Sequence, residues 1–201
     1  GLKSRSWLSW QIPVMTEGQH KNSKINFINK NKLLNYLNQG GIPIITGFQG
    51  VNENERVTTI GRGGSDASAI MLAKFFKAER CVIYTDVEGV YTTDPNKLKK
   101  AKKIKIISYE EMLEMASLGA KVMQPNAVQT SMIDNIPIHV RSTFSGKSGT
   151  KIVSEDETDE KKVITGIAYS KSNAKISIVG VVDKPGVAAD VFEPIGRNNI
   201  N

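Results

Sequence analysis

The stretch Gly61-Arg62-Gly63-Gly64-Ser65-Asp66 decides how this chain is organised. It follows a short run of β-prone residues, Val57 to Ile60. It also opens a segment in which apolar residues recur at helical spacing, namely Ala69, Leu72, Ala73 and Phe76. The pattern predicts a strand, a tight turn and then a helix whose N-cap is Ser65 or Asp66.

The glycine-rich turn has the chemistry of an anion-binding site. The first N–H groups of a helix have no intrahelical partner and carry the positive end of the helix dipole, so they attract anions. Gly63 and Gly64 let the backbone approach a ligand closely. Arg62 offers a planar guanidinium that can grip a carboxylate or a phosphate with two hydrogen bonds.

A second informative stretch begins at Cys81. The apolar run Cys81 to Thr85 has the length of a buried parallel strand and ends at Asp86. Residues 87–95 then form a loop at the carboxyl end of that strand, where open α/β sheets bind ligands. Cys81 is the single cysteine, so it is interpreted as a small core residue and no intrachain disulfide is expected.

These residues resemble a known family. The stretch Gly61 to Pro95 resembles the aspartate kinases, and its second half, from Thr85-Asp86-Val87 to Asp94-Pro95, resembles the nucleotide-binding segment of the wider amino-acid kinase superfamily. The resemblance covers essentially the whole chain. It implies transfer of the γ-phosphoryl of ATP to the β-carboxylate of L-aspartate, giving 4-phospho-L-aspartate, the first step towards lysine, threonine and methionine. It also implies ATP with Mg²⁺, held chiefly by the phosphates, and no metal ligand is assigned to the protein.

The resemblance also implies roles for individual residues. It places L-aspartate on the turn, at Arg62, Gly63, Gly64 and Ser65. Asp66 would orient the groups around the transferred phosphoryl, although an N-cap alone would also explain an aspartate there. Lys121 matches the family's phosphate-binding lysine, although without the resemblance it would be interpreted as a surface lysine.

The nucleotide contacts implied by the resemblance are Thr85, Asp86 and Tyr91. Two departures from the family pattern stand out. Asn96 is taken as a further nucleotide-binding residue, but many relatives carry arginine there, which puts its phosphate or ribose contact in doubt. The family's N-terminal Lys-Phe-Gly-Gly-Thr strand, with its phosphate lysine, has no counterpart here, so the chain is expected to be truncated at both ends and inactive alone.

Strands and helices alternate along the first three quarters of the chain, which favours an α/β fold with a parallel sheet covered by helices. The resemblance makes this a three-layer, amino-acid kinase-like fold with a mainly parallel sheet and its N-terminal part missing. Predicted strands are Ile25–Ile28, Ile42–Phe48, Ile104–Ile107 and Ile136–Val140. Predicted helices follow Asn29, Ser108 with Glu111 as a capping box, and Pro125.

The resemblance and a change in composition divide the chain into three parts. Residues 1–153 would be the C-terminal part of the catalytic domain, and 154–162, rich in charged residues and threonine, a linker. Residues 163–201 resemble the start of an α+β ACT regulatory domain, with strands at Val163–Tyr169 and Ile176–Val182 and a helix after Asp183–Gly186. An ACT domain implies an amino-acid feedback effector and homo- or hetero-oligomers formed through that domain.

Composition bounds the other function classes. The 201 residues carry a formal charge of +7 and a pI near 9.4, but the lysine run Lys97–Lys105 lacks interleaved aromatics and reads as a solvated loop, so no nucleic acid is expected. No stretch is apolar enough to span a bilayer and no signal-peptide pattern opens the chain, so a cytoplasmic location without membrane contact is expected. The clustered methionines are interpreted as core residues, and His139 is not interpreted as a metal ligand.

Two alternative functions stay open. The first is a different amino-acid kinase, acting on glutamate or a nucleoside monophosphate, because the loop from Thr85 to Pro95 is shared by the superfamily. The second is a non-catalytic regulatory or subunit-binding fragment. The glycine-rich turn argues against the first alternative, and the small share of ACT-like sequence argues against the second.

Overall fold

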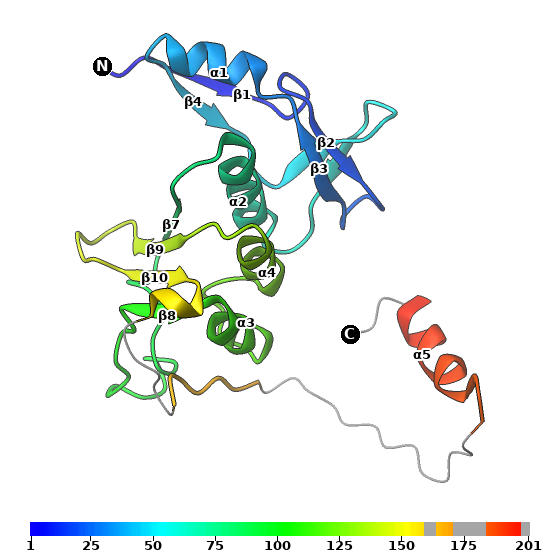
Figure 1. Cartoon of the computed structure of the whole chain (residues 1–201), viewed down its shortest axis with the longest axis vertical. Coiled ribbons are helices and arrows are strands. Elements are labelled where there is room, and N and C mark those ends of the chain that lie inside the picture. Colours follow the sequence, from blue (N-terminus) through cyan, green and yellow to red (C-terminus); the bar gives the residue numbers. More distant parts are fainter. Residues whose placement is uncertain (159–163, 171–183, 198–201) are drawn as a thin grey trace. The chain divides into compact units, whose positions relative to one another are not determined.

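The computed structural model describes residues 1–158, 164–170 and 184–197 (Figure 1). The chain forms two compact units, Gly1–Tyr169 and Ser170–Asn201. The first unit contains two hydrophobic cores, and the long helix that follows the glycine-rich turn packs against both of them.

The N-terminal part of the first unit holds two small sheets. Strand β1 (Ser4–Trp7) pairs in parallel with β4 (Ile42–Ile45). A mixed sheet has the order β3-β2-β5-β6, formed by Lys24–Ile28, Val14–Glu17, Gln49–Val51 and Val57–Thr59. The strands predicted around 25–28 and 57–60 are confirmed, whereas β1 and β2 were not predicted from the sequence.

Helix α1 (Asn31–Asn38) covers the N-terminal core through its buried Leu33. It ends where predicted, just before Gly40, whose φ of 73° reverses the chain direction. The predicted N-cap is wrong, because Lys30 occupies the cap position without a side-chain bond, while the Asn29 Oδ1 accepts a hydrogen bond from the Asn31 N–H at 3.3 Å. The core here is formed by Trp7, Ile12, Val14, Ile28 and Leu33.

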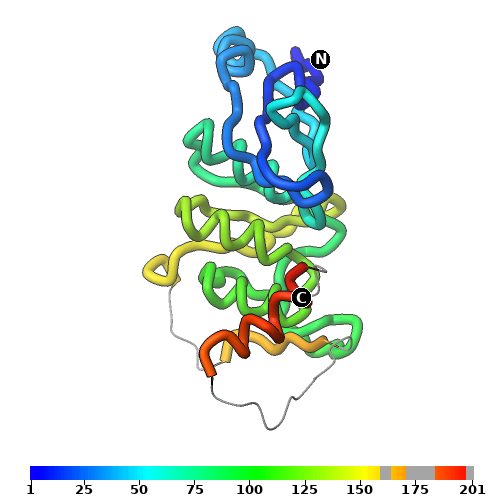
Figure 2. Tube along the Cα trace, turned by 90° about the vertical axis from the view of Figure 1, so that its right-hand side faces the viewer, coloured from blue at the N-terminus to red at the C-terminus, as the bar shows by residue number. Residues whose placement is uncertain are grey.

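The larger sheet has the order β7-β9-β10-β8. Its strands are Cys81–Thr85, Ile138–Ser142, Thr150–Val153 and Ile106–Ser108. The pairs β7–β9 and β10–β8 are parallel and β9–β10 is antiparallel, so the prediction of a mainly parallel sheet is confirmed for this sheet. Figure 2 shows the green and yellow segments of this region stacked together, apart from the blue N-terminal strands.

Strand β7 is parallel to β9, as predicted, but it is not buried on both faces. Cys81 and Ile83 lie in the core, whereas Val82 and Tyr84 on the opposite face are 37% and 61% exposed. Among the described residues the helices therefore cover one face of this sheet. The interpretation of Cys81 as a core residue is confirmed.

Helices α2 (Gly64–Phe76), α3 (Tyr109–Ser117) and α4 (Pro125–Ile133) pack on the larger core. The apolar residues of α2 do not share one face as predicted: Ala69 and Ala73 pack on the larger core, and Leu72 and Phe76 on the N-terminal one. A helix that lies between two cores needs apolar residues on two sides. A sequence pattern that looks for one apolar face therefore does not predict which residues contact which core.

Helices α3 and α4 form as the sequence predicts. The Ser108 Oγ accepts a hydrogen bond from the Glu111 N–H at 3.1 Å, and the Glu111 carboxylate accepts one from the Ser108 N–H at 3.1 Å. This reciprocal pair is a capping box. Pro125 opens α4 at its first position. The methionines are core residues: Met112, Met115 and Met123 are buried, and Met132 packs against the same cluster.

Of the predictions for the residues after Val153, one is confirmed, one is wrong and one lies outside the described residues. A short 3₁₀ helix covers Glu155–Glu157. Residues 164–169 form no strand, contrary to prediction, and they belong to the first compact unit. The predicted strand at 176–182 lies outside the described residues. The helix predicted after the turn is confirmed as α5 (Val187–Arg197), in which no side chain is buried.

None of the helices in the described ranges is both long and apolar enough to cross a membrane.

Candidate active site

The glycine-rich turn is shaped by its glycines, and the predicted N-cap is wrong. Gly63 is the N-cap of α2, with a φ of 71°, and no side chain caps the helix. A Cβ on Gly63 would lie 2.0 Å from the Gln124 Cγ, and one on Gly64 would lie 2.9 Å from the Phe48 ring. A side chain at Gly63 would meet both a left-handed backbone and occupied space, and one at Gly64 would meet the Phe48 ring, so both positions favour glycine.

Arg62 and Ser65 lie at the surface of this turn. Both residues are exposed, and neither side chain forms a hydrogen bond or ion pair with the described part of the chain. The Gly64 N–H donates to the Gly61 carbonyl at 3.0 Å and the Asp66 N–H to the Gly63 carbonyl at 3.1 Å. The Ser65 N–H and the Arg62 guanidinium, which have no acceptor among the described residues, are available to an anionic ligand.

Asp66 lies in the first turn of α2 and is half-buried. Since Gly63 caps the helix, capping does not explain this aspartate. Burial raises the pKa of the Asp66 carboxyl. Burial, and secondarily the Asp66 charge, raise the pKa of the Cys81 thiol to about 11, which places Asp66 near the start of β7. This thiol stays protonated at neutral pH and is not a nucleophile.

Lys121 lies in the break between α3 and α4 and is exposed. Gly119, with a φ of 116°, turns the chain there. Three residues after Lys121, the Gln124 side chain packs against Gly63. The fold thus brings the Lys121–Gln124 segment against the glycine-rich turn, a contact between segments about sixty residues apart in sequence.

The predicted nucleotide residues lie at and beyond the carboxyl end of β7. The Thr85 carbonyl accepts a hydrogen bond from the Thr143 N–H at 2.8 Å, and the Thr85 hydroxyl donates to the Asp86 Oδ1 at 3.1 Å. Asp86 is exposed. The Tyr91 hydroxyl donates to the Glu88 Oε2 at 3.3 Å.

A lysine from a distant loop completes this group. The Lys147 Nζ lies 2.8 Å from the Glu88 Oε1. The hydrogen bond from Lys147 lowers the pKa of Glu88, whereas partial burial and the neighbouring Glu88 raise the pKa of Tyr91. Tyr91 is therefore a neutral phenol held by a carboxylate that Lys147 keeps ionised.

The rest of the loop is anchored on β10. The Val90 N–H donates to the Thr150 Oγ1 at 2.9 Å, and a Cβ on Gly89 would lie 2.5 Å from the same oxygen. Asn96 is exposed, and its N–H donates to the Asp94 Oδ1 at 2.9 Å, so Asp94 to Asn96 is a side-chain-stabilised turn.

Four residues beside the predicted site were not foreseen: Phe48, Glu88, Gln124 and Lys147. Phe48 was expected to end a strand, but it has a φ of 69° and its N–H donates to the Ser68 Oγ at 3.0 Å. Its ring meets Gly64. The sequence offered one signal for these four residues, an aromatic residue directly after Gly47. The contacts of Gln124 with Gly63 and of Lys147 with Glu88 join residues far apart in sequence, so no local pattern indicates them.

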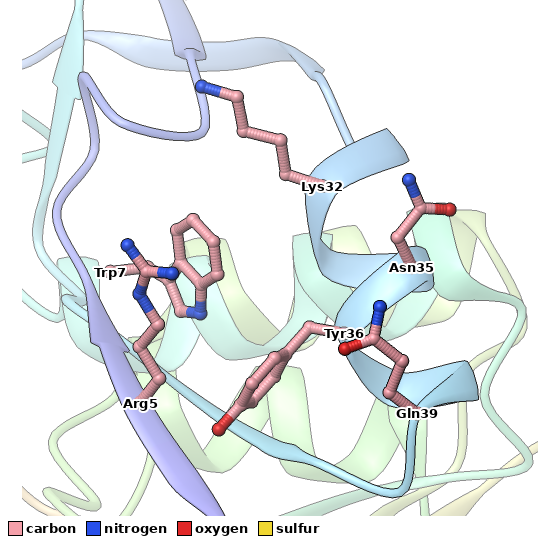
Figure 3. A pocket seen from close by; sticks show the side chains of 6 residues that line it. All are labelled: Arg5, Trp7, Lys32, Asn35, Tyr36 and Gln39. Carbon is pink, nitrogen blue, oxygen red and sulfur yellow. The ribbon is translucent and has the colours of Figure 1, made fainter.

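The two halves of the predicted site are not joined by a direct bond. Across the described ranges, no hydrogen bond or ion pair connects the glycine-rich turn with the loop after Asp86, and no group of three or more potential ligands could hold a metal ion. A cavity of about 260 Å³ between β1 and α1 contains none of the predicted site residues (Figure 3). It is lined by Arg5, Trp7, Lys32, Asn35, Tyr36 and Gln39.

Comparison with known proteins identifies the family. Residues 1–142 match the sequence description of the amino acid kinase family. The chain belongs to the amino acid kinase family. Among curated members it is 42% identical to the aspartate kinase of Pseudomonas putida over 201 residues, which is all of this chain and 49% of that protein. It is 41% identical to the aspartokinase of Geobacillus stearothermophilus, again over all of this chain and 49% of that one.

Solved structures show the same relation. The described fold is similar to that of E. coli aspartokinase III in complex with aspartate and ADP, with a TM-score of 0.82 and 29% identity over 100% of this chain and 46% of that one. This amino acid kinase chain thus spans about half the length of the curated relatives that it matches.

Proposed function

We propose that this protein is an ATP-dependent aspartate kinase that converts L-aspartate and ATP to 4-phospho-L-aspartate and ADP. The observation that carries the proposal is the glycine-rich turn at the N-terminus of α2, where no side chain caps the helix. There Arg62 is exposed and forms no side-chain bond with the described residues, as suits an anion-binding residue, and the whole chain is similar to aspartate kinases. The relative bound to aspartate and ADP has the same fold over this segment.

Arg62 and the turn would hold the substrate. A guanidinium binds a carboxylate through two hydrogen bonds, and the Ser65 N–H at the helix N-terminus favours the same charge. The Gly64 N–H already donates to the Gly61 carbonyl at 3.0 Å, so Gly63 and Gly64 would serve by letting the backbone approach the ligand. The β-carboxylate oxygen would attack the γ-phosphorus, forming one P–O bond while the bond to the bridging oxygen of ADP breaks. This reaction depends on positioning and charge stabilisation rather than on covalent chemistry by the protein.

Asp66 and Lys121 would serve the transferred phosphoryl. Lys121 is an exposed point charge on a segment that packs against the turn, a suitable position for reaching a phosphate oxygen. Asp66, half-buried in the first turn of α2, would orient the groups around the phosphoryl. Mg²⁺ would enter with ATP and be held mainly by the phosphate oxygens.

The nucleotide would lie along the loop after β7. Thr85 and Asp86 end that strand, and Tyr91 presents a phenol ring fixed by Glu88. Asn96 would make at most a weak contact, because a neutral amide replaces an arginine.

The C-terminal part would regulate the enzyme. A related structure, E. coli aspartokinase III, contains lysine together with aspartate. We extend the proposal to an amino-acid feedback effector bound at an ACT domain formed by residues 163–201 and what adjoins them, and to oligomers formed through that domain. The division at 1–153, 154–162 and 163–201 belongs to this proposal; it follows the sequence, and residues 164–169 nevertheless pack on the first compact unit.

The decisive experiment measures ADP release by the purified full-length protein with Mg²⁺-ATP. Aspartate, glutamate and UMP are compared as acceptors, and the product is trapped as the hydroxamate, which only an acyl phosphate forms. Release that depends on aspartate supports the proposal. Release that depends on glutamate or UMP would favour another amino acid kinase, and nucleotide or effector binding without turnover would favour a regulatory fragment.

A further inference from the structure

We infer that Gly166 and Ile167 are positioning residues for nucleotide binding. They belong to the segment Thr165–Tyr169, here called the strap, which runs beside the loop of Tyr91 to Asp94. The inference rests on the proposed function, since it takes Tyr91 as a nucleotide contact. In this inference the strap holds the loop of Tyr91 to Asp94 in one conformation within the first unit.

The strap is tied to the loop through the main chain. The Ile167 N–H donates to the Thr92 carbonyl at 2.8 Å. On its other side, Thr92 is paired with the lysine-rich segment, because its N–H donates to the Lys102 carbonyl at 2.8 Å and its Oγ1 accepts from the Lys102 N–H at 3.1 Å. Tyr91 itself forms a bridge with Lys103. The residue after Tyr91 is therefore held from two sides.

Gly166 allows the strap to come this close. A Cβ on Gly166 would lie 2.9 Å from the Met115 Sδ and 3.2 Å from the Thr92 carbonyl oxygen. Met115 belongs to α3 and is buried, so it has little room to retreat. A Cβ at this position requires either the end of the Met115 side chain or the strap to move, and it presses on the Thr92 carbonyl that accepts the bond from Ile167.

Side chains at both ends fix the register of the strap. The Thr165 hydroxyl bonds the carboxylate of Glu111, the residue that also closes the capping box of α3. The Tyr169 hydroxyl donates to the Asp94 Oδ2 at 3.4 Å. Asp94 is also the acceptor of the turn at Asn96. The strap is thus bonded to the loop at two residues, Thr92 and Asp94, which lie on either side of Thr93.

The consequence is specific to the nucleotide. A loop that loses one of its two supports samples more conformations, so ATP binding must restore the order at a cost in affinity. The residues proposed to bind the substrate aspartate, Arg62 to Ser65, lie on the turn before α2 and make no bond to the strap among the described residues. Loosening the strap should therefore affect ATP and spare aspartate.

The test compares Gly166→Ala with Gly196→Ala in the full-length protein. Gly196 is a matched control because a Cβ there meets nothing within 4 Å. We expect Gly166→Ala to raise the KM for ATP and the Kd for Mg²⁺-ADP by about three- to tenfold, the range of one weakened hydrogen bond. The kcat and the KM for aspartate should change by less than about twofold, and Gly196→Ala should change none of these.

A second pair of variants, with a smaller structural change, tests the inference in case Gly166→Ala fails to fold. Tyr169→Phe removes only the bond to Asp94, and Tyr84→Phe, at a residue that is 61% exposed, is its control. Tyr169→Phe should raise the Kd for Mg²⁺-ADP while Tyr84→Phe does not. A lower melting temperature with unchanged ATP and ADP affinities in both strap variants would overturn the inference and leave the strap a structural element.

The two proposals fail in different ways. If the unmodified protein binds Mg²⁺-ADP but does not phosphorylate aspartate, the proposed function fails, and the Kd for ADP still decides the role of the strap. If it phosphorylates aspartate and the strap variants keep its ADP affinity, only the strap inference fails. Absence of any nucleotide binding would overturn both.

Discussion

At the scale of single residues, Arg62 tests how the substrate is held. Arg62→Ala should raise the KM for aspartate much more than the KM for ATP, because a charge-assisted hydrogen bond contributes about 1.5 to 3 kcal/mol, or roughly ten- to a hundredfold in affinity. Arg62→Lys should recover only part of the loss, since an ammonium keeps the charge without the planar fork. Steady-state kinetics with each substrate varied in turn measures both effects. Equal losses for both substrates would remove Arg62 from the aspartate site.

Lys121 tests charge stabilisation at the phosphates. Lys121→Met should lower kcat by about a hundredfold or more, since it removes the lysine's positive charge, which would stabilise the negative oxygens of the transferred phosphoryl group. Lys100→Met is the control, because Lys100 is an exposed lysine of the run 97–105. Both variants should keep the melting temperature of the unmodified protein. Near-normal turnover of Lys121→Met would show that Lys121 is only a surface residue.

At the scale of elements, two helix N-termini make a matched comparison. Ser108→Ala should lower the free energy of unfolding by about 1 kcal/mol, because Ser108 caps α3 and is 3% exposed. Ser65→Ala should leave stability nearly unchanged, since no side chain caps α2. Chemical denaturation followed by circular dichroism measures both differences. A clear destabilisation by Ser65→Ala would mean that Ser65 caps α2 after all.

The same two helices show what a sequence can and cannot predict. The capping box of α3 involves residues three positions apart, so the local sequence specifies it. The cap of α2 depends on Gln124, about sixty residues away, which packs where a Gly63 side chain would be. No local signal contains that contact, and the prediction of Ser65 or Asp66 as the cap was wrong.

Short strands follow the same division. Strand β4 was predicted within its apolar run, whereas β1 (Ser4–Trp7) is mostly polar and exists because it pairs with β4, nearly forty residues later. For the candidate site, the motif supplied Arg62 and Asp86. It could not supply Lys147, which meets Glu88 across 59 residues, because only the fold of the larger sheet brings those loops together.

At the scale of the whole molecule, the first compact unit extends to Tyr169, beyond residue 163, where composition suggests that a new domain begins. The charged segment after Val153 looked like a linker with a new domain from residue 163. In the structure, residues 164–169 make contacts with the first unit through Thr92, Asp94 and Glu111. The compact unit therefore ends at Tyr169. A stretch with few apolar residues can still belong to a domain when main-chain hydrogen bonds and a close glycine contact hold it there.

The boundary can be tested with two shortened chains, ending at Tyr169 and at Thr158. The chain ending at Tyr169 should unfold within about 0.5 kcal/mol of the full 201-residue chain, because α5, the described helix beyond that point, buries no side chain. The chain ending at Thr158 loses the Ile167 bond to Thr92 and the cover over Met115, so it should be less stable by about 1 to 3 kcal/mol. Urea denaturation of all three chains under the same conditions compares their free energies of unfolding. If the two shortened chains were equally stable, the segment 164–169 would contribute nothing to the first unit, and the boundary near residue 163 that composition suggests would be the physical one.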